Sequence, residues 1–192
     1  MRSRSVLLKA ADIVFVVDVS LSVNIAALKG LLSDVISKMP INDIECQIAM
    51  KSFSTDAKTE FNFKDHKTKN EIKTYIANMN RFAGGSNLRD ALRPIMQMFS
   101  YSKGSRSYAK RFIIIFTDGL MVLSPELKTE VGNLLGYPNM IVSSVGIGYS
   151  VKHDHLEQIS TDINTILRPS AHNIWKYLQK SLAVPGCLVR II

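Results

Sequence analysis

The chain has 192 residues, 46% hydrophobic and 21% charged, a balance typical of one globular domain and unlike that of disordered or fibrous proteins. Its 24 lysine and arginine residues exceed its 16 aspartate and glutamate residues, giving a net charge of +8, but the basic residues are scattered apart from Arg2, Arg4 and residues 103–111. Because no nucleic-acid-binding motif accompanies this charge and no apolar run approaches the about 18 residues of a membrane span, we expect no nucleic-acid partner and no membrane insertion.

The amino-terminal residues only partly resemble a signal peptide. Lys9 and Asp12 interrupt the apolar stretch, and no plausible cleavage site precedes the first predicted strand. We therefore expect residues 1–10 to be a lead-in segment, residues 11–187 to form one domain and residues 188–192 to be a C-terminal tail. The lead-in is equally consistent with the cut edge of a larger, multidomain protein.

The chain is organised around residues 13–22, where five consecutive apolar residues end at Asp18 and are followed by Ser20 and Ser22. Such a run predicts a strand that is buried on both faces and whose carboxyl end enters a polar loop. In an open α/β sheet, ligands bind just beyond the carboxyl ends of the strands. Asp-x-Ser-x-Ser offers three oxygen ligands at this point, a set that suits a hard cation such as Mg²⁺.

Helix and strand patterns alternate through the rest of the chain. Apolar residues at helical spacing from Leu28 to Met39 predict an amphipathic helix that stops at Pro40. The later elements, in chain order, are predicted as a hairpin of strands 46–53 and 57–63, a helix opened by a capping box at 68–71, a helix 88–99 that Pro94 should kink or shift, a strand 111–118, a helix capped by Ser124, a strand 140–147, a short helix 155–159, a strand 164–167 and a closing helix 174–182.

This alternation predicts an α/β fold, a doubly wound, Rossmann-like, mostly parallel six-stranded sheet with one antiparallel edge strand and helices on both faces. A second apolar strand ends in aspartate at Asp118, as the first does at Asp18. If these two strands are neighbours where the strand order reverses, both carboxylates face one crevice. The glycine-rich loop 84–87 would bring Ser86 to the same crevice as a third contributor.

These residues resemble a known site. Asp18-x-Ser20-x-Ser22, then Gly-Gly-Ser-Asn at 84–87, then Phe-Thr-Asp-Gly at 116–119 are similar, in order and in strand context, to the metal-ion-dependent adhesion site (MIDAS) of the von Willebrand factor type A (vWA) domain. The resemblance covers residues 11–187. Residues 11–15, the strand end at 145–148 and a cysteine after the last helix are most similar to the extracellular-matrix branch, which includes the A domains of collagen VI and matrilins.

The resemblance implies a non-enzymatic, divalent-metal-dependent adhesion module of a secreted matrix or adhesion protein. Ser20 and Ser22 would be direct ligands, Ser86 would stand at the family's threonine position, and Asp18 and Asp118 would supply charge, largely through water. The cation would be Mg²⁺, with Mn²⁺ or Ca²⁺ as alternatives. Its sixth position would go to a Glu or Asp of a protein partner from the extracellular matrix or the cell surface.

The sequence departs from the family pattern at four positions. Ser86 keeps the hydroxyl of the usual threonine but lacks the methyl group that restricts its rotamer, Val19 and Leu21 are bulkier than the small residues common there, and Asn24 replaces a frequent glycine. No ligand oxygen is lost. The alternatives are a structural assembly domain of the same fold with a weak or unused metal site, and an intracellular A domain serving a large complex.

Other candidate residues are predicted to have ordinary roles. His153 and His155 are expected to be solvent-facing loop histidines, since no third metal ligand lies near them in sequence. Cys46 and Cys187 are either two thiols or one disulfide that ties down the last helix. Neither a nucleophile elbow nor a phosphate-binding P-loop motif occurs, which disfavours hydrolase and nucleotidase activity.

Overall fold

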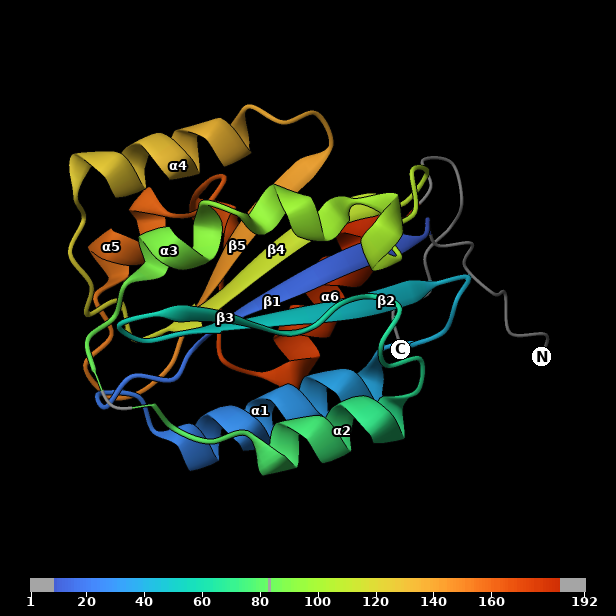
Figure 1. Cartoon of the computed structure of the whole chain (residues 1–192), viewed down its shortest axis with the longest axis horizontal. Coiled ribbons are helices and arrows are strands. Elements are labelled where there is room, and N and C mark those ends of the chain that lie inside the picture. The colour runs from blue at the N-terminus through green and yellow to red at the C-terminus, as the bar shows by residue number, and fades with distance from the viewer. Residues whose placement is uncertain (1–8, 83, 184–192) are drawn as a thin grey trace.

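The computed structural model describes residues 9–82 and 84–183. A six-stranded sheet with the order β3-β2-β1-β4-β5-β6 lies at its centre (Figure 1). The strands are β1 (Ala11–Asp18), β2 (Cys46–Phe53), β3 (Ala57–Phe61), β4 (Lys110–Thr117), β5 (Met140–Gly146) and β6 (Ile166–Leu167). All neighbouring strands pair in parallel except β3, which is antiparallel to β2 at the edge. The predicted doubly wound sheet with one antiparallel edge strand is confirmed.

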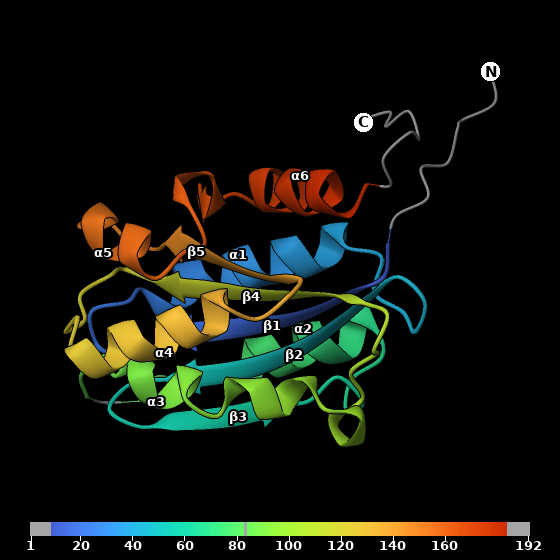
Figure 2. The same cartoon turned by 90° about the horizontal axis from the view of Figure 1, so that it is seen from above.

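Helices cover both faces of this sheet, as Figures 1 and 2 show. One face carries α1 (Ile25–Lys38), α2 (Lys69–Asn78) and α6 (Ala171–Leu182), and the other carries α3 (Leu88–Leu92), α4 (Pro125–Leu135) and α5 (His153–Gln158). Three short 3₁₀ turns complete the described structure: η1 (Ile95–Phe99), η2 (Tyr101–Lys103) and η3 (Ile163–Thr165). No helix in these parts of the chain is long and apolar enough to span a membrane.

The two faces explain why β1 is a continuous apolar run rather than an alternating one. Every residue of β1 is buried. Phe15 and Val17 contribute to the core beneath α1, α2 and α6, whereas Val14 and Val16 contribute to the core beneath α3, α4 and α5. Across the β1–β4 pair, Phe15 meets Phe116 edge to face with ring centroids 5.2 Å apart. A strand buried on both faces favours apolar residues at consecutive positions, as in residues 13–17, and the two buried aspartates of β1 are compensated by hydrogen bonds.

The helix starts follow the predicted capping chemistry. The capping box of α2 is present, because Thr68 accepts a hydrogen bond from the Glu71 backbone and the Glu71 side chain accepts one from the Thr68 backbone. Ser124 caps α4, with Pro125 in its first turn, and Asn24 caps α1 by accepting from the Ala27 backbone at 3.1 Å. Asn24, which departs from the family's frequent glycine, therefore stabilises the first turn of α1.

Several predicted elements have different bounds in the structure, among them the following three. The helix predicted over 88–99 is broken: α3 ends at Leu92, and the chain continues as the 3₁₀ turn η1, since Pro94 lacks a backbone N–H and its ring clashes with a continuing helix. The strand predicted over 164–167 shortens to β6, because a 3₁₀ turn capped by Asp162 occupies its first residues. The strand predicted over 57–63 ends at Phe61.

A buried ion pair fixes the end of the sheet opposite the aspartate-terminated strand ends. Asp12 in β1 accepts hydrogen bonds from Ser105 Oγ at 2.9 Å, from Arg106 N at 2.6 Å and from Arg106 Nε at 2.9 Å. The guanidinium of Arg106 also donates to the backbone oxygens of Ala11 and Glu45. The loop before β4, predicted only as polar and basic, is therefore anchored to β1 and to the start of β2.

Candidate functional site

The predicted site residues gather at the carboxyl end of the parallel strands, on the left of Figure 1. Because β1 and β4 are neighbours with Val17 paired to Phe116, Asp18 and Asp118 leave the sheet at the same edge. The loop before α3 reaches this edge through two backbone hydrogen bonds, from Phe82 N to the oxygen of Val19 and from Asn87 N to the oxygen of Ser54. This loop carries Ser86.

Asp18 is the centre of the site and has no exposed surface. Its Oδ1 accepts a hydrogen bond from Ser20 N at 3.0 Å, and its Oδ2 accepts from Ser86 Oγ at 2.9 Å and from Thr117 Oγ1 at 2.7 Å. Three donors from three chain segments thus compensate a fully buried carboxylate, which would be very unfavourable if left unpaired. The same three bonds bring the β1 loop, the Ser86 loop and the end of β4 together.

The hydroxyl groups of the site are held with their oxygens available. Ser20 Oγ and Ser22 Oγ lie 3.2 Å apart; Ser20 is buried, whereas Ser22 is exposed. Ser86 is half-buried and donates its hydroxyl hydrogen to Asp18. Since a hydroxyl oxygen has two acceptor lone pairs, this bond orients Ser86 without consuming its capacity to bind a cation.

Asp118 is positioned by a tight turn after β4. Its Oδ1 accepts from Leu120 N at 2.9 Å, and its backbone oxygen accepts from Lys152 N at 2.9 Å. The turn requires glycine at position 119, where φ is +80° and a Cβ atom would lie 2.9 Å from the Lys152 backbone oxygen.

The Gly119 backbone oxygen accepts a hydrogen bond from His155 Nδ1 at 2.8 Å. His155 lies in α5 and is half-buried, so the prediction of a solvent-facing loop histidine is wrong there, whereas His153 is exposed.

The loop that carries Ser86 rests on the turn between β2 and β3. Gly85 N donates to Thr55 Oγ1 at 3.2 Å. Gly84 has φ of +137°, and a Cβ atom there would overlap the side chain of Thr55. The two glycines of the sequence motif therefore allow a close approach that places the next residue, Ser86, against Asp18.

The donor set fits a hard divalent cation. Among the residues that the structure describes, no group of three or more His, Cys, Asp or Glu could hold a metal ion, so any cation site here depends on hydroxyl oxygens as well as carboxylates. Two carboxylates and three hydroxyls, from Asp18, Ser20, Ser22, Ser86 and Asp118, form an all-oxygen set of the type preferred by Mg²⁺, Mn²⁺ and Ca²⁺. Adjacent ligands of an octahedral Mg²⁺ lie about 2.9 Å apart. The 3.2 Å between the Ser20 and Ser22 oxygens is close to that spacing.

Sequence reasoning missed the role of Thr117. Its hydroxyl donates to Asp18 and accepts from Gly119 N at 3.1 Å, so it joins the two aspartate-bearing strand ends. A hydroxyl residue that ends the strand next to β1 is the feature that could have indicated this role. Burial raises the pKa of the Cys46 thiol to about 12. Cys187, which would pair with Cys46 in the disulfide alternative, lies outside the described residues.

Comparison with known proteins agrees with this geometry. The chain is 31% identical over 180 residues to the human (Homo sapiens) collagen alpha-5(VI) chain, covering 92% of this chain and 7% of that protein. It is 28% identical over 185 residues to human matrilin-1, covering 91% of this chain and 36% of that protein. The chain therefore spans only a small part of these relatives.

Solved structures share the fold. Proximal thread matrix protein 1 from the mussel byssus superposes with a TM-score of 0.76 at 24% identity, covering 91% of this chain and 47% of that one, and another structure of that protein has a zinc-occupied MIDAS motif. The manganese-loaded TRAP protein of Plasmodium vivax superposes with a TM-score of 0.79 at 14% identity, covering 93% of this chain and 76% of that one. The family model of the von Willebrand factor type A domain matches residues 12–175, and the chain thus belongs to the vWA domain family.

Proposed function

We propose that this domain is a non-enzymatic protein-binding module that uses a divalent cation, Mg²⁺, to bind a Glu or Asp carboxylate of a partner protein. The residues that would hold the cation are Asp18, Ser20, Ser22, Ser86 and Asp118. The observation that carries this proposal is the buried Asp18 carboxylate, which gathers three chain segments through hydrogen bonds from Ser20, Ser86 and Thr117.

The charge distribution favours an incoming carboxylate. Ser20, Ser22 and Ser86 are neutral ligands, and Asp18 already accepts three hydrogen bonds from the protein. The protein therefore supplies little direct anionic ligation, so that a bound cation would keep the electrophilic character needed to accept an outside carboxylate. Mg²⁺ also retains several waters when proteins bind it, and a partner's acidic side chain can replace one of them.

The surface around the site suits a protein partner. Leu21 in the β1 loop is 58% exposed and Val122 in the loop after β4 is 81% exposed, so large apolar side chains flank the hydroxyl ligands. A hollow of about 440 Å³ lies beside Ser86, with Arg89 and Val122 also in its lining. An acidic side chain flanked by apolar neighbours would match this surface, because it could bury those neighbours around the charged contact.

The relatives support the setting of this module. Collagen VI chains and matrilin-1 are much longer than the chain, and this supports the proposal that it is one domain of a multidomain protein of the extracellular matrix. The proposed partner is a matrix or cell-surface protein. The zinc- and manganese-loaded structural neighbours support a divalent cation at this place in the fold. Mg²⁺ is proposed because the donors are all oxygen and leave positions for the waters that Mg²⁺ retains, with Mn²⁺ and Ca²⁺ as the alternatives.

A pair of peptides tests the proposal. Acetyl-Gly-Glu-Gly-amide, titrated into ¹⁵N-labelled domain with Mg²⁺, should shift the amide signals of Ser20, Ser22 and Ser86, and the same peptide with Gln in place of Glu should not. The shifts should vanish in EDTA and in Asp118→Ala, while thermal unfolding shows that this variant is folded. Equal binding of the Glu peptide in EDTA would contradict the mechanism.

The assembly alternative has its own outcome. If the domain binds a matrix protein and this binding survives both EDTA and the double substitution Ser20→Ala/Ser22→Ala, the domain contributes contacts through other surfaces. Loss of that binding under either condition would support the cation-dependent mechanism.

A further inference from the structure

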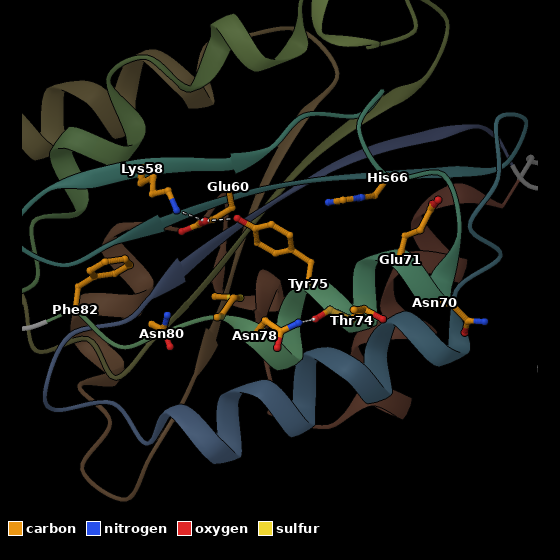
Figure 3. A pocket seen from close by; sticks show the side chains of 11 residues that line it. Lys58, Glu60, His66, Asn70, Glu71, Thr74, Tyr75, Asn78, Asn80 and Phe82 are labelled. Carbon is orange, nitrogen blue, oxygen red and sulfur yellow. Dashed lines mark hydrogen bonds and ion pairs between the residues drawn. The ribbon is translucent and has the colours of Figure 1, made fainter.

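A second recognition surface lies between the edge strand β3 and helix α2. Figure 3 shows this groove, which has a volume of about 600 Å³ and is lined by both polar and aromatic side chains. Its lining includes Lys58 and Glu60 from β3, Tyr75 from α2 and Phe82 from the segment after α2. It shares no residue with the candidate metal site.

The groove contains a buried carboxylate. The side chain of Glu60 is 5% exposed and accepts hydrogen bonds from Ser52 Oγ, from the hydroxyl of Tyr75 and from Lys58 Nζ at 2.9 Å. Burial alone would raise the pKa of Glu60, but the hydrogen bonds from Lys58, Ser52 and Tyr75 outweigh it and hold this pKa below its ordinary value of 4.5. Burial and the adjacent carboxylate raise the pKa of Tyr75 to about 12. Glu60 is therefore anionic at neutral pH and Tyr75 is a neutral donor.

This carboxylate can accept another donor, and one of its present donors is exchangeable. A carboxylate has about four acceptor positions, and Glu60 uses three of them. The donors Ser52 and Tyr75 come from a buried strand residue and a helix, whereas the side chain of Lys58 is 60% exposed. Exposed lysine pairs are held weakly because the lysine side chain loses rotamer entropy and water competes for it.

One aromatic ring, that of Phe82, lies near the Lys58 ammonium group, and other rings pack around Tyr75. Lys58 Nζ lies 6.0 Å from the centroid of the Phe82 ring, which is partly exposed. On the other side of Glu60, Tyr75 packs against His66 with ring centroids 5.4 Å apart (Figure 3). Tyr75 also packs edge to face against Phe61, with ring centroids 5.2 Å apart. A carboxylate beside aromatic faces is the environment that a guanidinium group fits best, because its planar fork binds carboxylates and stacks on rings.

We infer that this groove docks a segment of a partner protein that places an arginine side chain on Glu60 and displaces Lys58. The charge complementarity is local: the Glu60 carboxylate is the buried anion of the groove, and the chain's own lysine marks the place of the cation. The polar side chains of Asn70, Thr74 and Asn78 along α2 form the opposite wall and can hydrogen-bond the main chain of the segment.

Two capped peptides test the inference. Acetyl-Gly-Arg-Gly-amide should shift the amide signals of Glu60, Tyr75 and Phe82 in ¹⁵N-labelled domain. The isosteric peptide with citrulline in place of arginine should have an affinity at least about ten-fold lower, because it lacks the charge that strengthens the hydrogen bond. Because Lys58 competes for Glu60, Lys58→Ala should bind the arginine peptide several-fold more tightly. Lys176→Ala on α6, which changes the net charge equally, should leave the affinity unchanged.

The outcomes that overturn the inference are equally definite. Equal affinity for the arginine and citrulline peptides, shifts that map away from Glu60 and Tyr75, or no gain in Lys58→Ala would each reject it. Tighter binding of acetyl-Gly-Leu-Gly-amide would assign the groove to an apolar occupant instead. Asp118→Ala should bind the arginine peptide like the wild type, so a failure of the metal-site proposal leaves this test intact.

Discussion

Gly119→Ala should lower the free energy of unfolding more than the same substitution at an ordinary glycine, because Gly119 lies in the turn that carries Asp118. At Gly119 φ is +80°, and an added Cβ atom would lie 2.9 Å from the Lys152 backbone oxygen and 3.1 Å from the Lys152 Cβ atom. A non-glycine residue in the left-handed region costs about 1–2 kcal/mol. The contact with a backbone atom must also be relieved by moving the turn, so we expect a total loss of about 2–4 kcal/mol in the free energy of unfolding.

Gly132→Ala is the matched control. Gly132 is exposed within α4, and a Cβ atom there would meet nothing within 4 Å. Alanine in a helix interior is more favourable than glycine by about 0.5–1 kcal/mol. The same substitution should therefore destabilise the domain at one site and stabilise it at the other.

Urea unfolding, followed by circular dichroism, measures both effects. For a domain of this size, each kcal/mol corresponds to roughly 2–4 °C in Tm, so Gly119→Ala should melt roughly 4–16 °C lower. It should also weaken Mg²⁺ binding, since the turn that moves carries Asp118. If Gly119→Ala costs less than about 1 kcal/mol, or if Gly132→Ala costs as much as Gly119→Ala, the role assigned to this turn is wrong.

Three further predictions follow from the same structure. Asp12→Ala should lower the free energy of unfolding by about 3–5 kcal/mol, because it leaves the buried Arg106 guanidinium without its carboxylate. Lys67→Ala, which breaks an exposed ion pair, should lower it by less than about 1 kcal/mol, and urea unfolding measures both. Because the pKa of Glu60 is held below 4.5 in the folded state, its carboxylate stabilises the fold above that pH. The difference in free energy of unfolding between wild type and Glu60→Gln should therefore be present at pH 7 and disappear as the pH falls through the folded pKa; a constant difference down to pH 3 would contradict this. Mg²⁺ at about 100 times its Kd should stabilise the wild type by about 2.7 kcal/mol in thermal unfolding and leave Asp118→Ala unaffected; an equal rise in both would point to binding elsewhere.

Local sequence patterns were sufficient for the sheet and for the convergence of the site. Five consecutive apolar residues before Asp18 require a strand buried on both faces, and a similar run before Asp118 requires another. Parallel strands end at the same edge, so two acid-terminated strands imply one polar rim wherever they are neighbours. The structure makes them neighbours and adds Ser86 through its bond to Asp18.

Interactions between distant residues could not be predicted in this way. The partners of Arg106, which include Asp12 ninety-four positions earlier, depend on the packing of a loop whose composition indicates only that it is polar. The hydrogen bonds from Thr117 to Asp18 and from Tyr75 to Glu60 also depend on how separate elements pack together. Pro94 predicted a break in its helix, but the change to a 3₁₀ turn depends on how Ile95 and Phe99 fit the core.

The buried Asp18 carboxylate gathers hydroxyl oxygens from separate loops into a proposed site for a divalent cation. Calorimetric titration of Mg²⁺ into chelator-stripped domain, wild type beside Asp118→Ala, measures the binding of this cation. We predict saturable binding of one Mg²⁺ per chain to the wild type and none to Asp118→Ala, with thermal unfolding showing that both are folded. No binding to the wild type, or equal binding to both proteins, would contradict the proposed site.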